Sequence, residues 1–187
     1  MVASVLRLGT MAGIWRSYQI LLGRHPWKVQ IITTGTLMGI GDVISQQLIE
    51  QKGLKNHNTV RTMKMIGTGL CFVGPVLGTW YRVLDRTIPG KSKAVALKKM
   101  ILDQVAFAPC FLGGFLSFVS MLNGLSIEQI WKKLKRDYTD ALFVNYYIWP
   151  TVQIVNFYFI PLIHRLAVVQ FVAIIWNSYL SWKANKM

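Results

Sequence analysis

Polar side chains recur at helical spacing inside stretches of the chain that are otherwise apolar. Asp42 and Gln46 stand one helical turn apart and share a stripe with Gly35 and Gly39. A carboxylate and an amide in such a place can bind water, an ion or another helix, and a charged side chain at membrane depth is a functional candidate. We therefore predict that Asp42 and Gln46 line or gate a solute path. The alternative is that Asp42 bonds to a lysine or amide of a neighbouring helix and serves packing only.

Similar polar stripes occur in later apolar stretches. Lys99 and Asp103 are one helical turn apart, so we expect them to pair at the entrance of the stretch that follows. The other candidates for lining or gating a path are Asn145, Gln153, Asn156, Gln170 and Asn177. Lipid offers these groups no hydrogen-bond partner, so the stripes must face a common interior. Spacing alone supports two hypotheses equally. The stripes either line a water-filled path or hold helices together through hydrogen bonds of about 0.6–2 kcal/mol each.

Recognisable catalytic and metal-binding motifs are missing from the sequence. The histidines His25, His57 and His164 stand far apart, and no serine, histidine and acid fall in a known order. Cys71 and Cys110 lie in apolar stretches without a Cys-x-x-Cys pair. We expect no catalytic residue, no metal and no cofactor. The basic residues form no DNA- or RNA-binding module, so we expect no direct contact with nucleic acid.

The elements that must position these residues are membrane helices. Hydrophobic residues make up 53% of the chain and charged residues 15%, whereas a soluble domain carries about a quarter charged residues. The stretches apolar enough to span a bilayer are residues 29–49, 65–81, 104–127, 141–163 and 166–182. We predict an all-α, multi-pass integral membrane bundle with four to five membrane helices plus amphipathic interfacial helices. Its partners would be the lipid bilayer, small ions or metabolites, and further copies of itself or other membrane proteins.

The bundle is expected to be one domain. Residues 29–182 form it, between a basic segment at 1–28 and a short basic tail at 183–187. The first segment carries Arg7, Arg16 and Arg24 among apolar residues and contains no acid, which is typical of a mitochondrial import signal or an interfacial helix. Met11 is an alternative start.

Small residues and prolines are predicted to shape the helix contacts. Two pairs of glycines stand four residues apart, a spacing that permits close helix approach. Proline removes a backbone donor and so creates a hinge in a helix. The predicted packing and hinge residues are Gly35, Gly39, Gly74, Gly78, Pro109, Pro150 and Pro161.

Basic residues gather in the connections between apolar stretches. Lysine and arginine number 21 against 7 acids, a net charge of +14 that favours anionic lipid headgroups and would concentrate anions at the mouths of a path. Ser126 and Gln129 match a helix capping box, and the residues that follow are amphipathic. We predict a helix on the membrane surface, the alternative being a solvated connector. The predicted lipid-interface residues are Trp27, Trp131, Lys132, Lys133, Lys135 and Arg136.

A family resemblance becomes visible near the carboxyl end. The order Trp149-Pro150-x-x-Gln153-x-x-Asn156-Phe157-x-x-x-Pro161-x-x-x-Arg165, followed by Trp176-Asn177-Ser178-Tyr179-Leu180-Ser181, resembles the signature of the Mpv-seventeen/peroxisomal membrane protein family. Earlier motifs such as His25-Pro26-Trp27-Lys28 and Gly41-Asp42-x-x-x-Gln46-Gln47 occur in the order that the family has. The similarity therefore runs from about Met11 to the end of the chain.

The resemblance implies a small multi-pass protein of the mitochondrial inner membrane, with the peroxisomal membrane as the alternative. It further implies a non-selective channel that affects membrane potential, reactive oxygen species, the mitochondrial deoxynucleotide pool and maintenance of mitochondrial DNA. Two other functions stay open. One is a non-conducting scaffold or assembly factor, and the other is a carrier for nucleotides or other anionic metabolites, although the sequence shows no inverted repeat.

Overall fold

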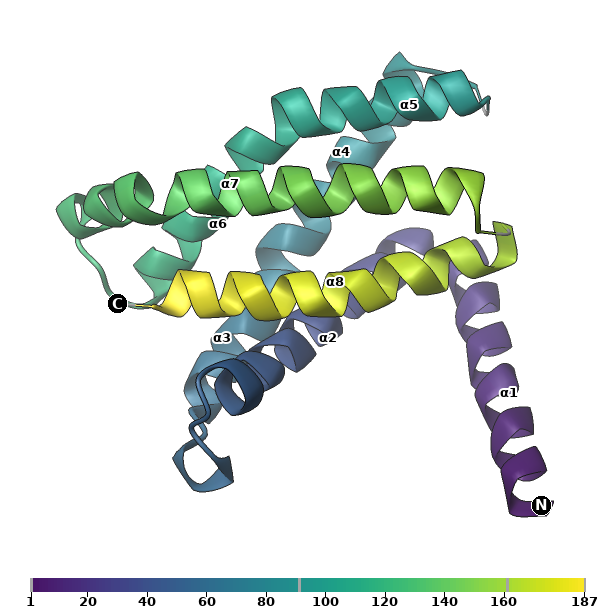
Figure 1. Ribbon diagram of the computed structural model, residues 1–187, viewed down its shortest axis with the longest axis horizontal. Coiled ribbons are helices and arrows are strands. Elements are labelled where there is room, and N and C mark those ends of the chain that lie inside the picture. Colours follow the sequence, from purple (N-terminus) through teal and green to yellow (C-terminus); the bar gives the residue numbers. More distant parts are fainter. Residues whose placement is uncertain (1, 91, 161, 187) are drawn as a thin grey trace.

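All regular secondary structure is helical in a computed structural model that describes residues 2–90, 92–160 and 162–186 (Figure 1). Side chains are described for residues 13–90, 92–155, 159–160 and 166–186. The elements are α1 (Val2–Arg24), α2 (Pro26–Ile44), η1 (Ser45–Ile49), η2 (Leu54–Asn56), α3 (Thr59–Thr68), η3 (Gly69–Val73), α4 (Gly74–Thr87), α5 (Lys93–Leu102), η4 (Asp103–Phe107), α6 (Ala108–Leu122), α7 (Ile127–Tyr158) and α8 (Leu162–Asn185). No strand occurs in these ranges, which confirms the predicted all-α class.

Helix α2 lies at the centre of the bundle. It packs against α8 on one side and against α3, η3 and α4 on the other, while α6 packs against α7. Helices α7 and α8 run antiparallel beside each other, and α1 leans away from the rest (Figure 1). The hydrophobic core lies at the end of the bundle that carries the C-terminus and includes Met38, Met65, Leu112, Phe115, Leu116, Val119, Trp176 and Leu180.

Several turns of these helices are π-helical. The segments η1, η3 and η4 continue the α-helices next to them, so that α3, η3 and α4 form one helix and α5, η4 and α6 form another. A π-helical turn inserts an extra residue and often marks a functional site. Asp103, the predicted partner of Lys99, begins η4.

Glycines allow α2 to approach its neighbours closely. A Cβ on Gly35 would lie 2.6 Å from the side chain of Leu70, and one on Gly39 would lie 2.6 Å from that of Ile66. A Cβ on Gly74 or Gly78 would likewise meet α2, at Ile31 and Trp27 respectively. On the opposite side, a Cβ on Gly41 would lie 2.7 Å from Asn177 of α8. These glycines set the distance between α2 and both of its neighbours.

We expect Gly69→Ala to destabilise the protein by about 1–3 kcal/mol, because the added methyl group overpacks a helix contact. A Cβ at Gly69 would lie 2.6 Å from the Cα atom of Gly35, where backbone rather than a movable side chain is in the way. Gly67→Ala is the matched control, since nothing lies within 4 Å of its Cβ position. Equilibrium unfolding in mixed detergent micelles measures both changes. An equal effect of the two substitutions would contradict the prediction.

One continuous helix among the described residues, Lys93–Leu122, is long and apolar enough to cross a membrane. The sequence predicts four to five such helices, and the multi-pass part of that prediction is not confirmed. Polar side chains on inward faces, such as Asp42 on α2 and Asn145 on α7, lower the mean hydropathy of the other long helices.

Helix α7 differs from the predicted pair of separate elements. The sequence predicts a surface helix after the Ser126 capping box and a separate membrane segment at 141–163, but the structure has one helix of 32 residues. No glycine or proline separates the two parts, so the helix continues through them. The capping box of Ser126 and Gln129 at its start is confirmed, and Pro150 lies inside it.

Candidate functional site

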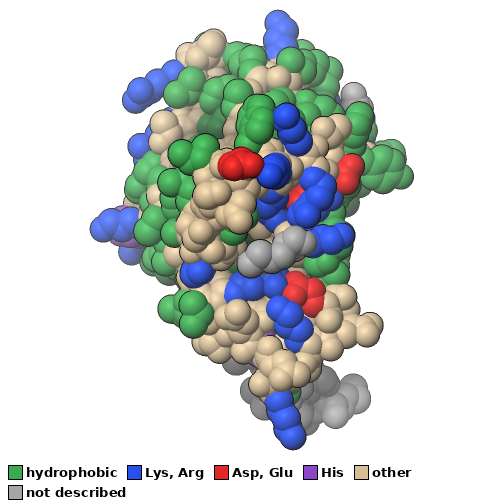
Figure 2. Space-filling model, turned by 90° about the vertical axis from the view of Figure 1, so that its left-hand side faces the viewer, with side chains coloured by type: hydrophobic (Ala, Val, Ile, Leu, Met, Phe, Trp, Pro, Cys, Tyr) green, Lys and Arg blue, Asp and Glu red, His purple; other side chains and the backbone are tan. Residues whose placement is uncertain are grey.

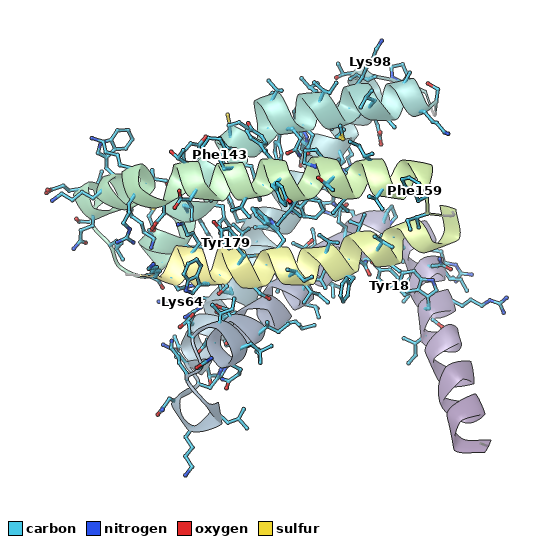
Figure 3. All side chains as sticks on the ribbon, in the orientation of Figure 1. Tyr18, Lys64, Lys98, Phe143, Phe159 and Tyr179 are labelled. Carbon is cyan, nitrogen blue, oxygen red and sulfur yellow. The ribbon has the colours of Figure 1, made fainter. Side chains whose placement is uncertain are left out.

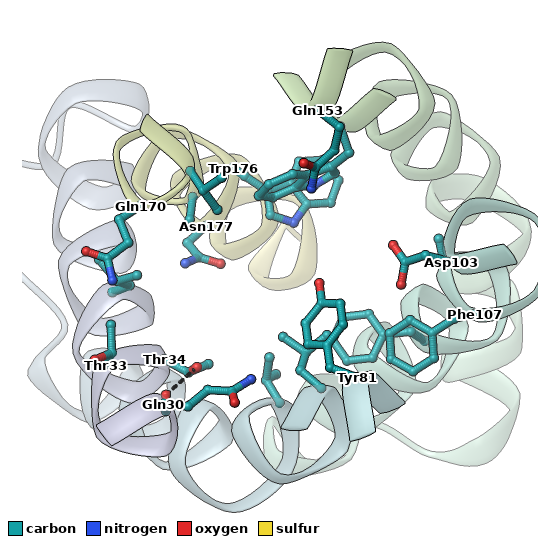
Figure 4. Close-up of a pocket in the computed structure, with 18 of the residues that line it drawn as sticks. Gln30, Thr33, Thr34, Tyr81, Asp103, Phe107, Gln153, Gln170, Trp176 and Asn177 are labelled. Carbon is teal, nitrogen blue, oxygen red and sulfur yellow. Dashed lines mark hydrogen bonds between the residues drawn. The ribbon is translucent and has the colours of Figure 1, made fainter. Parts of the chain in front are cut away.

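A cavity of about 600 Å³ lies between α1, α2, α4, α5, η4, α6, α7 and α8. Figure 4 shows it surrounded by helices, with polar side chains that point inward from several of them. Its lining mixes apolar and aromatic residues with a smaller number of amides, hydroxyls and charges. A concave site of this volume and composition is the common form of a binding or transport site.

Most of the predicted path-lining residues meet at this cavity. They come from α5, η4, α7 and α8, and they are Lys99, Asp103, Asn145, Gln153, Gln170 and Asn177. The side chains of Gln153 and Asn177 make no hydrogen bond with the described part of the chain, and neither does that of Gln30 on α2. Unpaired carboxamides that face a cavity require water or a ligand as a partner.

Asp103 is held in place at the cavity wall by a chain of hydrogen bonds. Its carboxylate accepts from Trp80 Nε1 at 2.7 Å and from Gln104 Nε2 at 3.0 Å. Asn145 in turn donates to Gln104 Oε1 at 2.7 Å, so the chain links η4 to α7. Trp80 also stacks on Phe107, with ring centres 4.8 Å apart, which fixes the indole that holds Asp103.

The predicted pair between Lys99 and Asp103 is wrong. Lys99 Nζ instead lies 2.6 Å from Asp85 Oδ1 of α4. Lys99 and Asp85 neutralise each other at the cavity mouth, where the Asp85 side chain is 74% exposed. Asp103 therefore remains as a carboxylate without a cationic partner in the described lining.

The cavity lining is exposed at one end and buried at the other. Asp85, Pro26 and Lys99 lie at the exposed end, near the junction of α1 and α2 and the end of α4. At the opposite end the lining residues Met38, Leu112, Phe115 and Leu180 are at most 3% exposed and belong to the hydrophobic core. A continuous path through the bundle would require this core to open.

Asp42 and Gln46 do not line the cavity but form a polar network beyond its buried end. Both side chains are fully buried. The Asp42 carboxylate accepts hydrogen bonds from Gln46, Thr62 and Ser181 at 2.7, 2.6 and 2.5 Å. Arg61 Nε lies 2.8 Å from Asp42 Oδ1 and forms an ion pair with it. The packing alternative, with Asp42 bonded to a neighbouring helix, therefore describes its place in this structure.

Arg61 extends the network to the protein surface. Its guanidinium contacts both carboxylate oxygens of Glu50, at 2.7 and 2.9 Å, and donates to Ser45 and Ser181 at 3.1 Å each. Burial raises the pKa of Glu50, but the hydrogen bonds from Arg61 and Lys52 outweigh it and hold this pKa at about 2. The network ties η1, α3 and α8 together at the buried end.

A second charged cluster joins the start of α7 to the end of α8. Asp137 accepts from Arg136 at 2.9 and 3.1 Å and lies 3.6 Å from Lys133 Nζ and 3.5 Å from Lys183 Nζ. Lys133 and Arg136 also donate to the backbone carbonyl of Lys186. Figure 2 shows the lysines and arginines gathered with a few carboxylates on the end of the molecule that carries the C-terminus.

The prediction that Lys133 lies at the lipid interface is wrong. Its side chain is 7% exposed, and burial lowers the pKa of Lys133 despite the nearby Asp137. The amphipathic pattern failed here because the face that carries Lys133 is covered by the end of α8. The remaining interface candidates on α7, namely Trp131, Lys132, Lys135 and Arg136, are exposed.

Other predicted residues fall elsewhere. Trp27 packs on Gly78, and Arg82 lies 4.1 Å from the centre of its ring. Pro109 accepts a hydrogen bond at its carbonyl from Tyr138.

Two predicted residues cannot be placed at the cavity. Asn156 belongs to α7, but its side chain lies outside the described ones, and Pro161 lies outside the described residues. Within the described ranges, no three His, Cys, Asp or Glu residues are placed to hold a metal ion.

Several lining residues were not found from the sequence. They are mostly aromatic or hydroxylated and include Tyr18, Gln30, Thr33, Thr34, Tyr81 and Trp176. Gln30, Thr33 and Thr34 follow the i, i+3, i+4 spacing of one polar helical face, which was a readable signal, but this face of α2 is a different one from the Asp42 stripe. Arg61 was also missed, because the predicted membrane segment begins only at residue 65 and leaves Arg61 in a basic connection, whereas α3 begins at Thr59.

Known proteins resemble the chain over nearly its whole length. Residues 120–181 match the model of the Mpv17 / PMP22 family. The mitochondrial inner membrane protein Mpv17 of Xenopus laevis is 77% identical over 94% of this chain and 99% of its own. The human protein of the same name is 63% identical over 93% and 99%, and the protein sym-1 of Neurospora crassa is 40% identical over 88% and 95%. No solved structure matches the chain.

Proposed function

Since the chain belongs to the Mpv17 / PMP22 family and is a protein of the mitochondrial inner membrane, we propose that it forms a weakly selective, gated channel there. The observation that carries the proposal is the cavity with its inward polar side chains, because hydrogen-bonding groups from six helices would not face an empty space in a mere anchor. The bundle would cross the bilayer several times, with its basic ends at anionic headgroups. It would conduct as a single chain or as a homo-oligomer, without enzymatic activity.

The buried end of the cavity supports gating. The core residues and the Asp42–Arg61 network lie between the cavity and the end of the bundle that carries the C-terminus. Opening would separate α8 from α2 and α3 and would break the hydrogen bonds that Ser181 makes. Through such a channel the protein would modulate membrane potential and so support control of reactive oxygen species, the deoxynucleotide pool and mitochondrial DNA maintenance.

A carrier is the second candidate, because a cavity that is exposed at one end and buried at the other is also the form of one state of alternating access. The cavity lining holds two carboxylates, Asp85 and Asp103, against one ammonium, Lys99. This balance disfavours nucleotides or other anionic metabolites as cargo. Reconstituted vesicles separate the candidates: uptake that saturates and is competed indicates a carrier, whereas flux that rises linearly with concentration indicates a channel. Stable complexes with membrane proteins and no flux at all would indicate a scaffold.

We expect Asp103→Asn to lower the cation-to-anion permeability ratio of single channels in planar bilayers. One unit charge about 8 Å from the path, at an effective dielectric constant of about 40, stabilises a cation by about 1 kcal/mol and destabilises an anion by as much, which together change this ratio roughly thirty-fold. Glu128→Gln is the control, since that carboxylate is 78% exposed on the surface of α7. An unchanged reversal potential with Asp103→Asn would remove Asp103 from the conducting path.

A further inference from the structure

Helix α1 supplies one wall of the cavity through very few polar contacts. Tyr18 and Leu22 line the cavity from this helix. The Tyr18 hydroxyl accepts a hydrogen bond from Gln170 Nε2 of α8 at 2.6 Å and lies 3.3 Å from Thr33 Oγ1 of α2. Figure 3 shows Tyr18 where α1 meets the N-terminal half of α8. One hydroxyl group thus joins the three helices that enclose this side of the cavity.

Elsewhere on the described part of α1, two glycine positions face open space. The helix leans away from the bundle towards its N-terminus (Figure 1), and nothing lies within 4 Å of the Cβ positions of Gly13 and Gly23. Trp15 stacks on Tyr18 of its own helix, with ring centres 5.5 Å apart. Movement of α1 would therefore break the Tyr18 hydrogen bonds while leaving the packing of α2 against α8 in place.

Exposed apolar side chains flank this wall, although Arg16 and Arg24 are also exposed on α1. Ile14, Ile20 and Leu21 are exposed on α1, as are Ile32 on α2 and Phe171 on α8. In a membrane protein such side chains face lipid. A gap opened at α1 would connect the cavity with the bilayer rather than with water.

The inside of the wall offers neutral hydrogen-bonding groups. Gln30 and Asn177, which point into the cavity in Figure 4, make no hydrogen bond with the described part of the chain. Gln170 would also become available once its bond to Tyr18 is broken. The Asp103 carboxylate on the opposite wall disfavours an anion. The groups suit a molecule with a neutral, hydrogen-bonding head and an apolar body.

We propose that α1 is a movable side wall, latched by Tyr18, and that its displacement opens a lateral portal through which a neutral amphiphile enters the cavity from the bilayer. The portal serves as an access route to a binding site inside the protein. It does not depend on whether the cavity conducts solutes.

A cysteine inside the cavity tests the portal. The exposed Cys71 and Cys110 are first replaced by serine, and Thr34→Cys then places one thiol on the cavity lining. Pyrenyl maleimide dissolved in phosphatidylcholine vesicles stands in for the amphiphile, and a sulfonated thiosulfonate reagent probes access from water. We expect Tyr18→Phe and Gln170→Leu each to raise the pyrene labelling rate roughly five-fold, the effect of losing one hydrogen bond. The aqueous reagent should react at an unchanged rate.

The matched control is Tyr147→Phe, which removes a hydroxyl group from a side chain that is 81% exposed, and should leave both rates unchanged. Equal acceleration of both reagents by Tyr18→Phe would show general loosening and overturn the proposal. No acceleration by either substitution would overturn it as well. Since labelling needs no flux, failure of the portal leaves the proposed channel untouched, and absence of flux leaves the portal untouched.

Discussion

Arg61→Gln will destabilise the protein by about 3–5 kcal/mol, because it removes one partner of a buried ion pair and leaves the other uncompensated. The Asp42 side chain is fully buried and the Arg61 side chain is 8% exposed. Asp42 would keep its bonds from Gln46, Thr62 and Ser181 but lose its only cationic contact in the described structure. Glu50 would lose the two hydrogen bonds that fix it to α3. The loss should appear in equilibrium unfolding in mixed micelles with increasing dodecyl sulfate, followed by far-ultraviolet ellipticity.

Arg86→Gln is the control for the chemical change, because Arg86 is exposed on α4 and its replacement should alter the unfolding free energy by less than about 0.5 kcal/mol. The double variant Asp42→Asn with Arg61→Gln removes both charges. Its destabilisation should therefore be smaller than the sum of the two single effects. Additive effects, or an Arg61→Gln effect below about 1 kcal/mol, would contradict the assignment of the network as a structural lock.

The outline of the fold could be predicted from local patterns. Glycine spacing predicted where α2 approaches its neighbours, and the Ser126 capping box predicted the start of α7. Inward polar faces also follow from periodicity, since a stripe of amides is recognisable without knowing its partner. For this reason residues as distant as Asp103 and Asn177 could be expected to share an interior, and the structure places both at the cavity.

Pairing between helices could not be predicted in the same way. Asp42 meets Ser181 across 139 positions and Arg61 meets Ser181 across 120, and no local pattern in one sequence encodes such separations. Lys99 shows the same limit at short range. Asp103, four residues after Lys99, was the expected partner, yet Lys99 pairs with Asp85 of α4 instead. Periodicity predicts which face of a helix is polar but not which helix covers it.

Whether a polar residue lines the cavity or belongs to the buried ion-pair network also depends on its position along the bundle axis. Asp42 and Asp103 are both carboxylates in apolar stretches, so the same role in a solute path was predicted for both. In the structure, Asp103 lies beside open volume, whereas Asp42 lies beyond the core residues that close the cavity. Function and stability should therefore separate: Asp103→Asn should change selectivity, and substitutions around Asp42 should change unfolding or gating.

The charged cluster at the end of α8 gives the second large effect. Asp137→Asn will leave the buried ammonium groups of Lys133 and Lys183 without their shared carboxylate and should cost about 3–5 kcal/mol. Asp140→Asn is the matched control. It removes a carboxylate that lies 3.0 Å from the same Lys183 but is 69% exposed, so it should cost no more than about 1 kcal/mol. Hydrogen exchange of the last turns of α8 reports the loss directly.

The pH dependence distinguishes this ion cluster from ordinary packing. Burial raises the pKa of Asp137, but the hydrogen bonds and charge of Arg136, with Lys133 and Lys183, lower it more, so its pKa lies below the ordinary value. A lowered pKa means that the stabilisation is complete above the unfolded pKa of about 4 and is lost as the pH falls through the folded value. Asp137→Asn should therefore flatten the decrease in unfolding free energy below about pH 5. Because Glu50 titrates in the same acid range, some slope should remain. A variant that keeps the full acid slope would show that Asp137 does not hold α8 by charge.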